Sequence, residues 1–145
     1  MPIFGLLEYD QASPAAQLVF DDIMRTRQTD RVNNFWKALA NHPPTLQRIW
    51  ENVKQVMGPS RLDALTKEMI YVAVSVTNNC EYCLHSHIAS ARKLGMDDEM
   101  LAEVLAVAGL ANETNRLANG YRVCGRGVFV TYKKRGRAEV SQARE

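Results

Sequence analysis

The chain has 145 residues, of which 46% are hydrophobic and 23% are charged, and its formal net charge is +2. These values are typical of one soluble globular domain with a single core, and so small a charge argues against a nucleic-acid partner. The longest apolar runs, IYVAV and VLAVAGLA, fall short of the ~18–20 residues that a membrane-spanning helix needs.

The N-terminal segment MPIFGLLEYD does not read as a signal peptide, because it has no basic region and Glu8 and Asp10 interrupt its apolar run. We therefore expect a cytoplasmic protein in a reducing compartment. Three cysteines are too few for a disulfide scaffold. In such a compartment a CxxC pair indicates catalysis or metal binding rather than a structural bridge.

The first half of the chain predicts three helices. Ser13 as N-cap and Pro14 at the first helical position begin a helix over 13–26. A second helix begins at Asp30, carries an apolar face that includes Trp36, and ends at residues 42–44 (HPP). A third helix follows from 45, with Trp50 on its apolar stripe, and Gly58 and Pro59 stop it. We expect both tryptophans to belong to the core.

The second half predicts further helices with recognisable ends. Ser60 and Asp63 resemble a capping box, and the helix after them becomes apolar on most sides, as in a central helix. Asn78 and Glu81 resemble a second capping box. The helix that follows ends at Gly95.

The C-terminal part predicts one more helical region. Asp97 caps a helix over 98–111, and residues 112–120 extend the helical pattern. VFVTY (128–132) favours a short β-segment, but the chain has no series of alternating strands and no repeats. The expected fold is all-α, with one domain over residues 1–132 and a polar tail over 133–145.

The segment NNCEYCLHSHIASARKLG (78–95) concentrates the groups that can carry out chemistry. At 100° per residue, Cys83 lies about 60° from Cys80 around a helix, and His87 lies about 40° from Cys83. His85 points roughly 140° away from Cys80, which indicates an exposed or interface residue. His87 can therefore assist the thiols, and His85 cannot.

The start of the cysteine helix should activate the thiols. Free N–H groups and the helix dipole in the first turn favour a thiolate, which is the reactive form of cysteine. His87 is one turn after Cys83, where side chains meet, and a nucleophile beside a base is the general pattern of an activated thiol.

Glu68 is predicted to join this group through the depth of two antiparallel helices. It lies about ten residues before the turn at 77–79, and His87 lies about nine residues after it, so both are roughly 13–15 Å from the turn. A carboxylate at that depth could orient His87, as the third member of a catalytic triad orients its base.

The pattern of Glu68, eleven residues, Cys80-x-x-Cys83, three residues and His87 resembles the alkylhydroperoxidase AhpD-like branch of the carboxymuconolactone decarboxylase superfamily. The resemblance is strongest over residues 60–110. It implies an all-helical trimer or hexamer that reduces hydroperoxides without a cofactor or a metal. An external dithiol, such as a lipoyl-bearing protein, would re-reduce it.

The resemblance also implies roles for the site residues. Cys83 would attack the peroxide, Cys80 would resolve the intermediate, and His87 and Glu68 would form a proton relay. The best-studied form has a histidine directly before the second cysteine, where this chain has Tyr82. Tyr82 is therefore a candidate accessory residue, either packing or lining the site, and the natural substrate is left open.

Other interpretations of the same residues stay open. Cys80, Cys83, His87 and Glu68 could bind zinc, although there is no second CxxC. A decarboxylase-type enzyme of the same superfamily would not need the cysteines, and a redox-sensing or metal-binding interaction protein would not be an enzyme.

The remaining groups have simpler interpretations. Glu68 could instead pair with Lys67 or Arg61 at the surface. Cys124 has no base at helical spacing and should be a small buried hydrophobe. Residues 116–137 carry seven basic and no acidic side chains, which indicates a solvated face or a subunit contact.

Overall fold

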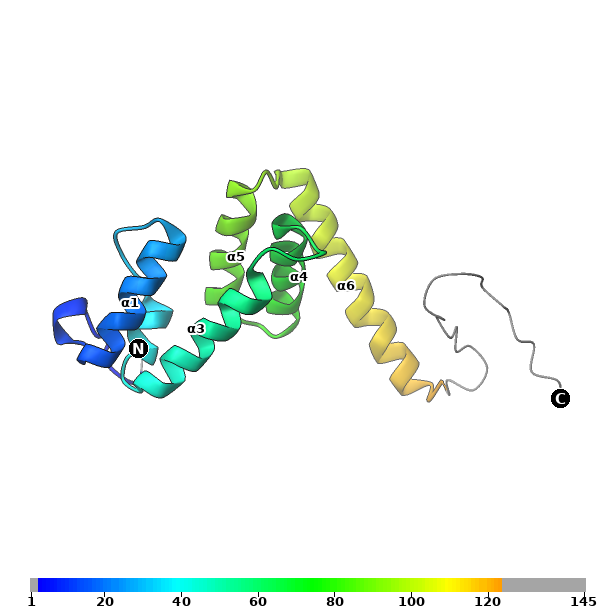
Figure 1. The fold of residues 1–145 in the computed structure, drawn as a ribbon. Coiled ribbons are helices and arrows are strands. Elements are labelled where there is room, and N and C mark those ends of the chain that lie inside the picture. The colour runs from blue at the N-terminus through cyan, green and yellow to red at the C-terminus, as the bar shows by residue number, and fades with distance from the viewer. Residues whose placement is uncertain (1–2, 124–145) are drawn as a thin grey trace, which may run out of the picture. The chain divides into compact units, whose positions relative to one another are not determined.

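A computed structural model describes residues 3–123 of the chain, and every regular element in this range is helical (Figure 1). The elements in chain order are a 3₁₀ turn (Tyr9–Gln11), α1 (Pro14–Arg27), α2 (Asn34–Leu39), α3 (Pro43–Met57), α4 (Ala64–Thr77), α5 (Glu81–Lys93) and α6 (Asp98–Gly120). The all-α fold class is thus confirmed. Cys124, the 128–132 run, the tail and most of the basic 116–137 segment lie outside the described residues.

The contacts between residues divide the chain into two compact units, Met1–Lys67 and Glu68–Glu145. The division falls in the first turn of α4, so the side chains of Glu68, the cysteines and His87 all belong to the second unit. The single domain over residues 1–132 stays a prediction. Within residues 3–123, no helix is both long enough and apolar enough to cross a bilayer.

Two tryptophans lie at the centre of the first unit. Trp36 on α2 and Trp50 on α3 are each 2% exposed, and their rings meet edge to face with centroids 5.4 Å apart. The prediction that both belong to the core is confirmed.

Asp22 on α1 accepts hydrogen bonds from Lys54 Nζ at 2.7 Å and Trp50 Nε1 at 2.6 Å. Lys54 first, and then Trp50, hold the pKa of Asp22 below its usual range.

Two predicted helix boundaries in the first unit are wrong. The second helix begins at Asn34 rather than Asp30, and it is only six residues long. Pro43 and Pro44 begin α3 instead of only ending α2, because proline fits the first turn of a helix, where its missing N–H is not needed. His42 is the N-cap of α3, and its ring accepts a hydrogen bond from the Thr45 N–H.

The start of α4 also differs from the prediction. Asp63, not Ser60, caps this helix: its carboxylate accepts the Thr66 N–H and the Thr66 hydroxyl, both at 2.8 Å. These two hydrogen bonds lower the pKa of Asp63. The helix predicted to be central, because its second half is apolar on most sides, has one open face: Ile70 and Val74 are each 50% exposed in the single chain.

The second unit begins within α4, at Glu68, and α4 and α5 lie side by side, joined by a three-residue turn (Figure 1). The α5 helix ends as predicted: Gly95 has a φ of 101°, and the N–H groups of Gly95 and Met96 bond back to Arg92 and Ala91.

Asp97 caps α6 by accepting a hydrogen bond from the Met100 N–H at 2.8 Å, also as predicted. The two C-terminal helical segments form one continuous helix, α6. Its second half extends beyond α4 and α5 (Figure 1).

Candidate active site

Cys80 joins the end of α4 to the start of α5. Asn79 takes the left-handed conformation, with a φ of 54°, and the N–H groups of Asn79 and Cys80 bond to Val76 and Ser75 in the last turn of α4. This is a complete Schellman ending, with asparagine in the place that glycine usually occupies. The Cys80 sulfur then serves as the N-cap of α5 and accepts the Cys83 N–H at 3.3 Å. The prediction that Asn78 caps α5 is therefore wrong.

Cys80 and Cys83 are bonded as a disulfide, with their Cα atoms 5.3 Å apart. Both residues are partly exposed. The turn that ends α4 fixes Cys80, and the first turn of α5 fixes Cys83. The arrangement therefore needs only local backbone structure to hold the two sulfurs at bonding distance.

Glu68 and His87 form the contact that the depth argument predicts. The Glu68 Oε2 atom on α4 lies 2.6 Å from His87 Nδ1 on α5. Both side chains are mostly buried, with 14% and 21% of their surfaces exposed. The alternative in which Glu68 pairs with Lys67 is wrong, since Lys67 Nζ donates instead to the carbonyls of Val56 and Gly58.

The two histidines of the motif lie in different environments, as the helical spacing predicts. The His85 side chain is 76% exposed, and its Nε2 atom lies 3.8 Å from the Glu81 carboxylate on the same helix. His87 lies one turn after Cys83 on α5. Tyr82, the residue between the cysteines that differs from the best-studied form, is 44% exposed in the first turn.

Tyr71 is a site residue that sequence reasoning missed. Its ring stacks on the imidazole of His87, with centroids 3.6 Å apart and an angle of 17° between the planes. Tyr71 follows Glu68 by three positions on α4, so the two side chains leave the helix on one face. That spacing was visible in the sequence, but an aromatic residue in an apolar helix reads first as part of the core.

The residues that the structure describes hold no cluster of three or more His, Cys, Asp or Glu side chains arranged to bind a metal ion.

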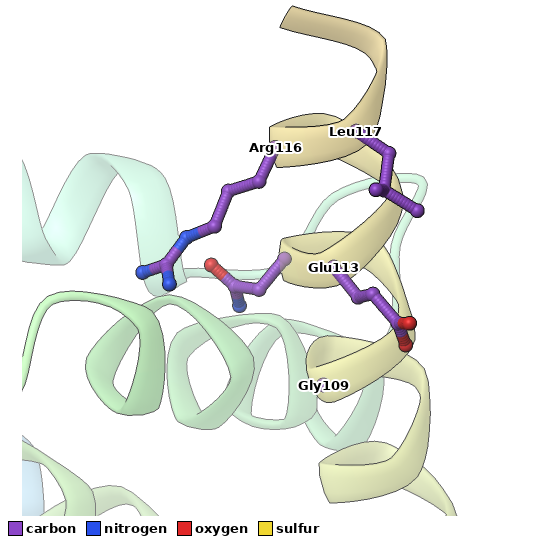
Figure 2. Close-up of a pocket in the computed structure, with 5 residues that line it drawn as sticks. Gly109, Glu113, Arg116 and Leu117 are labelled. Carbon is purple, nitrogen blue, oxygen red and sulfur yellow. The ribbon is translucent and has the colours of Figure 1, made fainter. Parts of the chain in front are cut away.

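A hollow of about 390 Å³ on α6 is lined by Gly109, Asn112, Glu113, Arg116 and Leu117. Figure 2 shows Arg116 extending to one side of the helix, and Glu113 and Leu117 to the other. All five residues belong to α6, and Glu68, Cys80, Cys83 and His87 are not among the residues that line the hollow.

The second unit thus combines a disulfide with an acid–base pair. A disulfide at a helix N-terminus can exchange with external thiols, and its reduced form can supply a thiolate. The Glu68 carboxylate engages one nitrogen of His87, which leaves the other nitrogen to accept or donate a proton. The candidate site is therefore suited to reactions that oxidise two thiols and move a proton.

Known proteins resemble the chain in both sequence and structure. The model of the carboxymuconolactone decarboxylase family matches residues 43–124. The crystal structure of the alkylhydroperoxidase AhpD core from Rhodospirillum rubrum shares 50% sequence identity, with a TM-score of 0.81. That match covers 86% of this chain and 93% of the bacterial one.

Two curated relatives are themselves uncharacterized. An uncharacterized protein in the cox locus of Paracoccus denitrificans is 36% identical over 55 residues, which are 38% of this chain. The chain spans half the length of that protein. An uncharacterized protein of Cupriavidus necator is 33% identical over 85 residues, covering 58% of this chain and 74% of the relative.

Proposed function

Because this chain belongs to the carboxymuconolactone decarboxylase family, as an AhpD-like member, we propose that it is a thiol-dependent peroxidase that reduces alkyl hydroperoxides. The observation that carries the proposal is the joint placement of the Cys80–Cys83 pair and the Glu68–His87 pair on two adjacent helices. A decarboxylase-type reaction would give the paired cysteines no role, so the disulfide favours redox chemistry.

In the proposed cycle the Cys83 thiol first loses its proton to His87. The thiolate attacks one oxygen of the hydroperoxide, and the O–O bond breaks. The alkoxide takes a proton and leaves as the alcohol, and Cys83 becomes a sulfenic acid. The Cys80 thiol then attacks the Cys83 sulfur, which releases water and forms the disulfide.

The enzyme returns to its starting state at the expense of an external dithiol, such as a lipoyl-bearing protein. One thiolate of the donor attacks the disulfide, and its second thiol resolves the mixed disulfide, so the donor leaves oxidised. Glu68 holds His87 through Nδ1 and stabilises the positive charge that the ring gains, as a triad carboxylate does.

Oxidation of the reduced protein should follow a fixed stoichiometry. One equivalent of alkyl hydroperoxide should consume two of the three thiols and yield one alcohol, because each peroxide takes two electrons. Thiol titration and peptide mapping of the unfolded protein should show a Cys80–Cys83 bridge with Cys124 still a free thiol. A Cys124→Ala control should lose the same two thiols. A bridge from Cys124 to either cysteine would contradict the assignment.

We further propose that α6 associates with a second copy of the chain, as the expected trimer or hexamer requires. Val107, Leu110 and Leu117 of α6 and Tyr121, its C-cap, are separated by three, seven and four positions, which places them on one stripe of the helix together with Thr114. They are 67%, 61%, 50% and 80% exposed. An apolar stripe this open supports an interface, and a second copy presents the same stripe.

Light scattering should therefore give a mass that is a multiple of the 16.3 kDa of one chain. Leu110→Glu should lower that mass, since it places a charge in the stripe at a position too exposed to affect the fold of one chain. Asn115→Glu, at an exposed position about 140° around α6 from Leu110, should leave the mass unchanged. A mass of one chain for the unmodified protein over a wide concentration range would contradict the proposal.

A further inference from the structure

A single hydrogen bond does not fix the orientation of His87. Because a ring N–H points in the plane of the imidazole, the hydrogen bond between His87 Nδ1 and the Glu68 carboxylate limits rotation within that plane. The ring could still tilt about the line that joins Nδ1 to Oε2, because the last torsion of a histidine side chain has a broad range. Tilting would move the second nitrogen, Nε2, away from any one direction.

Tyr71 supplies the missing restraint. Its ring lies nearly parallel to the imidazole, at 3.6 Å between centroids, so it blocks tilting on one side of the ring. The hydrogen bond and the stack act at right angles to each other. Together they restrict both the tilt of the His87 ring and the direction of its nitrogens.

Tyr71 belongs to the same helix as Glu68. The Ser75 hydroxyl, in a residue that is 3% exposed, donates to the Tyr71 carbonyl at 2.7 Å. Glu68, Tyr71 and Ser75 follow one another by three and four positions, so they lie on a single stripe of α4. The carboxylate and the aromatic ring therefore reach His87 from one rigid element.

We propose that Tyr71 is a positioning residue, which holds the His87 imidazole in the plane from which Nε2 exchanges a proton with the Cys83 thiol. This inference rests on the proposed function for its purpose. Its geometry can be tested without any peroxide. The contribution comes from the ring and not from the hydroxyl group, so phenylalanine should replace tyrosine.

The test compares Tyr71→Leu with Tyr71→Phe in the full chain. The rate at which reduced Cys83 reacts with iodoacetamide near neutral pH should fall about 2- to 12-fold in Tyr71→Leu, the range that one aromatic contact represents. Tyr71→Phe should stay near the unmodified rate. In Tyr71→Leu, but not in Tyr71→Phe, the NMR signals of the His87 ring protons should lose the shift that a stacked ring causes.

A second comparison separates positioning from a general effect on the fold. If Tyr71 acts through His87, adding Tyr71→Leu to a His87→Ala background should change the Cys83 alkylation rate no further. An equal fall in both backgrounds would overturn the proposal, and so would a Tyr71→Phe variant as slow as Tyr71→Leu. Tyr71→Met is a second non-aromatic variant if leucine prevents folding.

These measurements also keep the two proposals apart. A protein that reduces no hydroperoxide but shows the ring-proton shift and the background dependence would refute the peroxidase function and keep the positioning role. The opposite result, active peroxide reduction with no effect of Tyr71→Leu, would refute the positioning role alone.

Discussion

Replacing Cys83 by serine is expected to abolish peroxide-dependent turnover, leaving only the slow reaction of peroxide with the dithiol donor. A serine hydroxyl does not form an anion near neutral pH and cannot pass through a sulfenic acid, so the first step is lost. Cys80→Ser should also stop turnover, but after one oxidation of Cys83. Peroxide consumption and trapping of the sulfenic acid with a 1,3-diketone distinguish these two outcomes.

The two cysteines offer a matched control for each other, because they belong to one helical turn and form one disulfide. Trapped sulfenic acid should appear at Cys83 in Cys80→Ser, and none should appear in Cys83→Ser. The reverse pattern would exchange the two roles. That outcome has a physical basis to be tested, since the Cys80 sulfur is the one that accepts a backbone N–H.

His87→Ala should slow peroxide-dependent disulfide formation by about 10²–10⁴-fold, the usual contribution of a general base. The loss should shrink at high pH, where the thiol ionises without help. Stopped-flow measurement of disulfide formation across a pH series would show this convergence. A loss that stays constant at all pH values would mean that His87 supports the fold and not proton transfer.

Glu68→Gln and His85→Ala complete this test. Glu68→Gln should slow disulfide formation as His87→Ala does but more weakly, because an amide can still hydrogen-bond Nδ1 but lacks the charge that stabilises an imidazolium.

His85→Ala should have little effect, since His85 is 76% exposed and lies on another face of α5. If His85→Ala is as damaging as His87→Ala, the assignment of helical faces is wrong.

The contact between Glu68 and His87 was predictable because it depends on constant helix geometry. Once a short turn joins two antiparallel helices, equal distances from the turn place residues at equal depth. The observed 2.6 Å contact agrees with that argument. The same constant geometry explains why the spacing of His85 and His87 is enough to assign them to different faces of α5.

The ends of the helices were less predictable because several residues could cap each one. Asn78 is a good N-cap by type, but Asn79 readily adopts the left-handed conformation, and that ending of α4 leaves Cys80 to cap α5. Tyr71 was missed for a related reason: stacking depends on side-chain orientation, which helical spacing does not determine. The exposed face of α4 at Ile70 and Val74 could not be anticipated from their apolar character alone.

The central claim, a catalytic dithiol cycle, is tested most directly by steady-state peroxide consumption. The assay combines a small amount of protein with excess alkyl hydroperoxide and a dihydrolipoyl donor. We expect many turnovers for each chain, with one donor oxidised and one alcohol formed for each hydroperoxide, and none of this activity with Cys83→Ser. Consumption that stops after one hydroperoxide for each chain, with donor still in excess, would contradict the account and indicate a redox sensor.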